Sequence, residues 1–168
     1  MARGDIQPFD TANARLTSAV TYMVQPGRAG ADGTVSRIQP GEPVIKLAGA
    51  TGVIAAVTSS PTSTLRIVGV AASTSTETAS ATGIVTVVPA TNGQIWMVAP
   101  ATAASWDTQT EYNALVGARV LLQNSAGTYT ILASDGAGNG CIVEYLDIAK
   151  YPGMVAFSFS PLCDYRNV

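Results

Sequence analysis

Few side chains in this chain could take part in acid–base or nucleophilic chemistry. Its 168 residues contain nine Lys and Arg, eleven Asp and Glu, and no His. The lack of His excludes Ser-His-Asp and Cys-His catalysis, His-ligated zinc and haem, and the commonest general base near neutral pH. A Ser–Lys nucleophile would need Lys46 or Lys150, and neither lies in a recognisable motif.

Two pairs of carboxylates could in principle cleave a glycosidic bond, Asp107 with Glu111 and Glu144 with Asp147. Thr108 followed three residues later by Glu111 is the pattern of a capping box, which favours a helix start over an acid–base pair. On a strand, Glu144 and Asp147 would point to opposite faces. We therefore expect both pairs to be structural or solvated, and the chain not to be an enzyme.

The glycine-rich loop 135–140 and the two cysteines lack the patterns of metal and cofactor sites. The loop has one carboxylate and no closing bidentate Glu, and it lacks the strand-to-helix context of a dinucleotide site. Cys141 and Cys163 have no C-x-x-C spacing, which favours two reduced structural thiols; a disulfide between them stays open. We expect no metal and no cofactor.

The composition indicates which kinds of partner the surface suits. The net charge is −2 and the basic residues are scattered singly, so we expect no direct contact with nucleic acid. No stretch approaches the roughly 20 apolar residues of a membrane span, so we expect no membrane contact. Only 12% of residues are charged, and a surface this poor in charge favours a partner that covers part of it.

From residue 38 onward, short apolar strands are separated by turn signals. Asn92-Gly93 is a hairpin signal, and the Ser/Thr-rich stretch 73–82 reads as an exposed loop. One short helix is expected within 102–117, beginning at Thr108 and ending at Gly117. The spacing predicts an all-β fold with a barrel or sandwich-like domain and at most one short helix. The predicted strands are 44–48, 53–59, 65–72, 83–90, 94–99, 118–124, 128–134, 141–148 and 154–160.

Residues 1–35 differ from the rest, because prolines and glycines interrupt them and their apolar residues are thinly spread. Only 17–24 alternates well enough for a strand. We expect an extended arm over 1–35 and a β-barrel-like domain over 36–168, so that the domain stays folded without residues 1–30. Residues 1–16 lack the apolar run of a secretory leader.

Two tryptophans, Trp96 and Trp106, flank the segment 97–105. Such residues are most often part of a core. They also fit an interface hot spot, or a carbohydrate platform together with Tyr112, and the neighbouring residues do not decide between these.

The strand pattern resembles the small decoration (cement, or head-stabilising) proteins of tailed bacteriophage capsids. The resemblance lies in QPGEPVIK, VIAAVTS, RIVGVAAS with its Ser/Thr/Ala loop, GIVTVVP with the following Asn-Gly turn, and YNALVGARVLLQNSAGTYTIL. It implies a β-barrel or β-tulip domain, often with an N-terminal arm and frequently trimeric. It also implies binding to the major capsid protein on the outer surface of the virion, after synthesis in the host cytoplasm, and it carries no catalytic residues.

On this hypothesis the chain is a capsid-stabilising structural protein. Another phage structural β domain (tail, connector or fibre-associated) and a carbohydrate-binding module are the alternatives. The candidate residues for contact with the capsid or another subunit are Phe9, Leu16, Tyr22, Met23, Trp96 and Trp106.

Overall fold

The computed structural model describes eight stretches of the chain that together form two β-sheets and one α-helix. Residues 6–8, 19–26, 37–46, 53–56, 67–90, 94–125, 127–133 and 140–160 are described. The predicted all-β class with at most one short helix is confirmed. The strands are β1 (Gln7–Pro8), β2 (Val20–Val24), β3 (Pro43–Lys46), β4 (Val53–Ala56), β5 (Ile67–Ala71), β6 (Gly83–Pro89), β7 (Trp96–Val98), β8 (Arg119–Ser125), β9 (Thr128–Leu132), β10 (Cys141–Val143) and β11 (Val155–Phe159).

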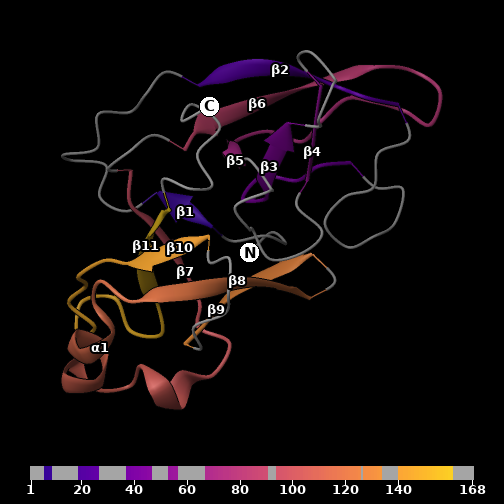
Figure 1. The fold of residues 1–168 in the computed structure, drawn as a ribbon. Helices are drawn as coiled ribbons and strands as arrows, with labels where there is room; N and C mark the ends of the chain where they lie inside the picture. The colour runs from indigo at the N-terminus through magenta and orange to yellow at the C-terminus, as the bar shows by residue number, and fades with distance from the viewer. Residues whose placement is uncertain are drawn as a thin grey trace.

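The strands divide into an antiparallel sheet of six and a ring of five (Figure 1). The six-stranded sheet has the order β1-β7-β11-β10-β8-β9. In the ring, pairing runs β2-β4-β3-β5-β6 and returns to β2. All ring pairs are antiparallel except β2–β4, which is parallel and joins only Met23 to Val53 and Val24 to Ile54. The ring therefore depends on the longer pairing of β2 with β6, which spans five residues.

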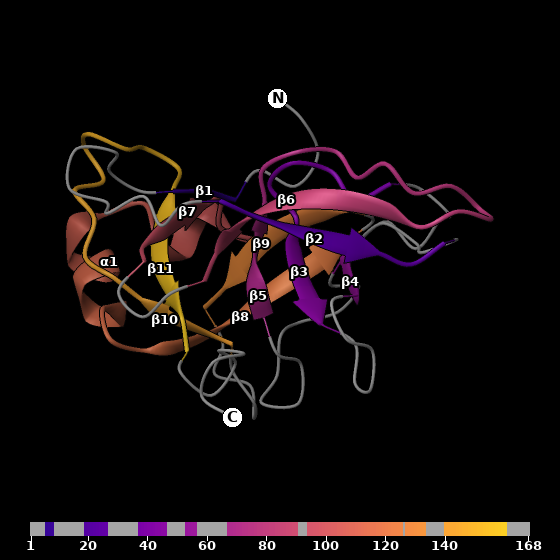
Figure 2. The ribbon, with the colours of Figure 1, turned by 90° about the horizontal axis from the view of Figure 1, so that it is seen from above.

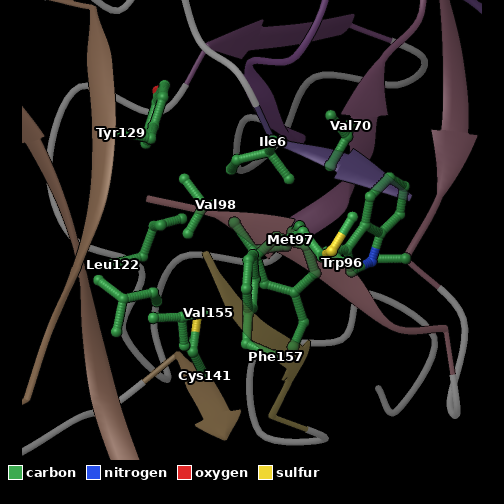
Figure 3. Packing of buried hydrophobic residues seen from close by; sticks show 14 of the residues in the cluster. Ile6, Val70, Trp96, Met97, Val98, Leu122, Tyr129, Cys141, Val155 and Phe157 are labelled. Atoms are coloured by element: carbon green, nitrogen blue, oxygen red, sulfur yellow. The ribbon is translucent and has the colours of Figure 1, made fainter. Parts of the chain in front are cut away.

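The core joins the ring to the sheet. It contains Val70 from β5, Val98 from β7 and Ile6, which directly precedes β1, each at most 3% exposed. Figure 3 shows these three side chains close together. Because apolar side chains from the ring and the sheet share one cluster, the described residues form a common hydrophobic core.

One helix, α1 (Gln109–Leu115), and a 3-10 turn, η1 (Ala103–Ser105), precede β8. The predicted capping box is confirmed: Thr108 Oγ1 accepts from Glu111 N at 3.2 Å, and Glu111 Oε2 accepts from Thr108 N at 3.2 Å. The chain leaves the helix at Gly117, whose φ is 81°. Positive φ costs glycine little, so this residue makes the turn into β8 possible.

Tyr112 fastens α1 to the six-stranded sheet. Its side chain is fully buried, and its hydroxyl accepts from Ala156 N at 2.9 Å and donates to Glu144 O at 3.0 Å. Burial raises the pKa of Tyr112 to about 12, because the folded protein disfavours the phenolate.

Replacing Tyr112 by Phe tests this contact. At neutral pH we expect a loss of about 1–3 kcal/mol in unfolding free energy, because the buried Ala156 N–H loses its acceptor. The pKa of Tyr112 is higher when folded (about 12) than when unfolded (about 10), so its stabilising contribution is complete below pH 10 and is lost between pH 10 and 12.

Urea unfolding at neutral pH and between about pH 9 and 12 measures both effects. Burial and Glu42 also raise the pKa of Tyr129, which is present in both proteins, so the difference between them isolates Tyr112. An equal loss of stability with rising pH in wild type and Tyr112→Phe would contradict the assignment.

The Ser/Thr-rich stretch predicted as an exposed loop lies between β5 and β6, outside the strands, and most of its residues are exposed. Its first part is nevertheless joined to β6 by hydrogen bonds, so that it continues the β5–β6 hairpin. Thr86 N donates to Ser73 Oγ and Ile84 N donates to Thr76 Oγ1, both at 3.0 Å. Thr76 N also donates to Ile84 O at 3.0 Å. Side-chain hydroxyls thus accept in place of backbone carbonyls beside β6, and residues 78–82 form a continuous exposed tip.

The described parts of residues 1–35 belong to the folded body. β1 pairs with β7, and β2 pairs with both β4 and β6. Ile6 and Val24 are 3% and 0% exposed. The expectation that the domain stays folded without residues 1–30 stays a prediction, and the pairing of β1 and β2 with strands far along the chain argues against it. For the rest of 1–35, which lies outside the described residues, the arm stays a prediction.

Deleting residues 1–30 should abolish cooperative thermal unfolding. The deletion removes one strand from each sheet together with buried Ile6 and Val24, and a single large buried side chain is worth about 2–5 kcal/mol of a total near 5–15 kcal/mol. Calorimetry and near-ultraviolet circular dichroism measure the loss, with deletion of residues 1–5 as the control that keeps both strands. A sharp transition in the longer deletion would show that β1 and β2 are dispensable.

Candidate interaction surface

The sequence-predicted interface residues fall into three groups in the structure. Phe9 and Leu16 lie outside the described residues. Tyr22 is half-buried and packs against the core, whereas Met23 is 54% exposed. Trp96 and Trp106 are only 1% and 5% exposed.

The two tryptophans are core residues, and their proposed interface role is corrected. Trp96 packs against Phe159 with ring centroids 6.3 Å apart, and Trp106 meets Tyr112 edge-on at 5.6 Å. All three residues of the candidate carbohydrate platform are therefore inside the protein, where a sugar cannot stack on their faces. Figure 3 shows Trp96 within the packed cluster.

Met23 is part of an outward-facing apolar pair, of which the sequence predicted only Met23 as an interface residue. Its register partner on β6 is Ile84, which is 51% exposed. On the same side, exposed Thr21 lies opposite half-buried Thr86. We call Thr21, Met23, Ile84 and Thr86 the β2–β6 face.

Alternation along β6 produces this face. Gly83, Val85 and Val87 are buried, and Ile84 between them is exposed. The run IVTVV is apolar at nearly every position, so the sequence predicts a strand covered on both sides, by the core or by another subunit. Within the described residues the outer side at Ile84 is open, and period-two alternation from buried Val85 is the signal that locates it.

The described residues of β2 and of the β5–β6 hairpin carry no exposed charge. The described residues 19–26 and 67–90 include one charged residue, Glu77, which is 4% exposed. Of the exposed charged side chains that the structure describes, all but Arg37 lie on or beside α1. We define the α1 pole by these residues, Asp107, Glu111, Arg119, Asp147 and Lys150. Figures 1 and 2 place α1 and β2 at opposite ends.

The backbone beneath Ile84 is held from both sides. Met23 pairs with it on one side, and Thr76 exchanges two hydrogen bonds with it on the other. Glycine is required next to it, because a Cβ at Gly83 would overlap the backbone of Glu77. The apolar pair is therefore presented on a rigid support.

Glu77 is the least compensated polar group in the hairpin. Both of its carboxylate oxygens are buried without a hydrogen-bond partner. An uncompensated buried carboxylate costs stability, so the hairpin is held by its packing on Gly83 and its ladder and not by this side chain.

Replacing Gly83 by Ala tests whether close packing holds the hairpin. We expect a loss of at least about 2–3 kcal/mol in unfolding free energy, because the new methyl group meets backbone that cannot rotate away. Gly153→Ala is the matched control: nothing lies within 4 Å of its added methyl, and its φ of 71° costs about 1–2 kcal/mol. Equal losses in urea unfolding would show that the hairpin is loosely packed.

The carboxylate pairs weighed for catalysis have structural partners. Asp107 and Glu111 are exposed. The hydrogen bond that Asp107 donates to Glu111, together with the charge of Glu111, raises the pKa of Asp107. The hydrogen bonds that Glu111 accepts from Thr108 and Asp107 lower the pKa of Glu111. Glu144 Oε1 accepts from Ser158 Oγ at 2.6 Å, and Asp147 Oδ1 accepts from Ala149 N at 3.1 Å. These contacts explain the carboxylates as cap, cross-strand and turn residues.

The remaining candidate groups give no assembled site among the described residues. There, no three His, Cys, Asp or Glu side chains gather as metal ligands. Cys141 is buried, while Cys163 and most of the loop 135–140 lie outside the description, so the pairing of the cysteines stays open. Lys150 Nζ, weighed as part of a Ser–Lys pair, lies 5.2 Å from the ring centroid of Tyr151. In the described stretches no helix is long and apolar enough to cross a membrane.

Comparison with known protein families, with curated proteins and with solved structures finds no match for this chain.

Proposed function

We propose that this chain is a structural protein of a phage virion, a decoration (cement) protein that binds the outer surface of the capsid. It stabilises the contacts between major capsid protein subunits and belongs to the virion surface. The observation that carries the proposal is the rigid, charge-free β2–β6 face, with Met23 and Ile84 half exposed side by side.

This face suits permanent burial against another protein. About 25 cal/mol is gained for each Å² of apolar surface removed from water, and no exposed charge on the face has to be desolvated. An exposed apolar pair without a charged side chain on its own face suits a protein partner, because exposed apolar patches on soluble proteins commonly mark protein–protein contacts.

Mass action explains how a cement protein stabilises a shell. A protein that binds only the assembled shell stabilises it by an amount that grows with the concentration of the free protein. The resemblance implies a homo-oligomer, with a trimer favoured, and several linked copies would add avidity on a repeating lattice.

The direct test mixes the purified protein with expanded capsid shells of the same virus prepared without it. We expect stoichiometric binding and a shell that withstands higher temperature. Shells that neither bind the protein nor gain heat resistance would overturn the proposal. Imaging of complete particles separates it from a tail, connector or fibre location.

Replacing Ile84 by Lys should weaken shell binding by at least about tenfold without unfolding the protein. The lysine places a charge in the centre of the apolar pair, and one uncompensated charge in an interface costs more than about 1.4 kcal/mol. Tyr145→Lys is the matched control, because Tyr145 is 61% exposed and lies near the α1 pole. Affinity of both variants for shells is measured by sedimentation; if they bind equally well, the β2–β6 face is not the contact.

A further inference from the structure

Among the residues that the structure describes, the exposed charges are distributed unevenly. On the described strands β2 and β6, and on the hairpin that continues β5 and β6, no charged side chain is exposed. Arg37, which is exposed, directly precedes Ile38, and Ile38 exchanges two hydrogen bonds with Ser75 of the hairpin.

The opposite end has exposed apolar side chains as well, but they lie among charges. Val116 and Tyr145 are 41% and 61% exposed. Exposed Arg119 follows Val116 by three residues, and exposed Asp147 follows Tyr145 by two. Covering this end would strip water from charged groups, whereas covering the β2–β6 face would not.

We propose, building on the proposed function, that the protein sits on the shell in one orientation, with the β2–β6 face against an uncharged, apolar patch of coat protein and the α1 pole in solvent. The occupant of the face follows from its chemistry. Methyl, thioether and threonine side chains offer a coat surface apolar contact and hydroxyl groups, and they offer no charge for an acidic or basic partner to pair with.

Two consequences are measurable. Because no ion pair contributes, the affinity for shells should change by less than about threefold between about 0.05 M and 0.5 M salt, a range in which a charge-driven contact is strongly screened. Because the orientation is fixed, residues of the two ends should differ in accessibility on the decorated particle.

Site-directed labelling tests the orientation. Thr21→Cys on the face and Thr110→Cys on α1, both exposed positions, are made in a Cys163→Ser background, where the remaining Cys141 is buried. Each variant is treated with a bulky maleimide reagent, free and bound to shells. We expect shells to slow labelling of Thr21→Cys by about tenfold or more, since well-packed contacts exclude solvent, and to leave Thr110→Cys unchanged.

Every other result overturns the inference. Protection of Thr110→Cys with Thr21→Cys still reactive would reverse the orientation. Equal reactivity of both positions on the shell would place the contact elsewhere, and a strong loss of affinity in salt would show that charges drive it. In these three cases the protein still binds, so the cement function survives. Absence of binding by the wild-type protein would overturn both the inference and the proposed function.

Discussion

The pairing of β2 with β6 is the contact on which this structure depends. It spans five residues, whereas the other neighbour of β2 in the ring, β4, is joined by two parallel register pairs. The same pairing has two sides. Inward, it encloses Val24, Val85 and Val87; outward, it sets Met23 beside Ile84. Core and candidate interface are thus two faces of one ribbon, and a one-residue slip would exchange them.

The fold class was accessible from the sequence because its signals are local. Turn residues separate strands of the expected length, and the Thr108–Glu111 spacing locates the helix start. Long-range pairing is harder to predict. β1 has only two residues and shows no strand pattern. The alternation of 17–24 predicts β2 itself, but not its partners, and the place of both strands depends on the distant β7 and β6.

The candidate surface was only partly predictable for a related reason. Met23 was identified as an apolar residue in a sparse segment, but Ile84 lies in a run that is apolar on both sides. Tryptophan is common both in interface anchors and in cores, and only the tertiary structure shows that Trp96 and Trp106 are buried. Ser73 and Thr76 resemble loop residues until their hydroxyls are seen to accept backbone N–H groups.

The central claim is that a charge-free β ribbon, supported by a rigid core, holds this protein on a capsid. The most direct measurement is a cryo-electron microscopy map of the complete particle at a resolution that separates strands. The account predicts density for this chain on the outer shell, with β2 and β6 against coat protein and α1 pointing outward. Density for the chain in the tail or connector, or on the shell with α1 against the coat protein, would contradict it.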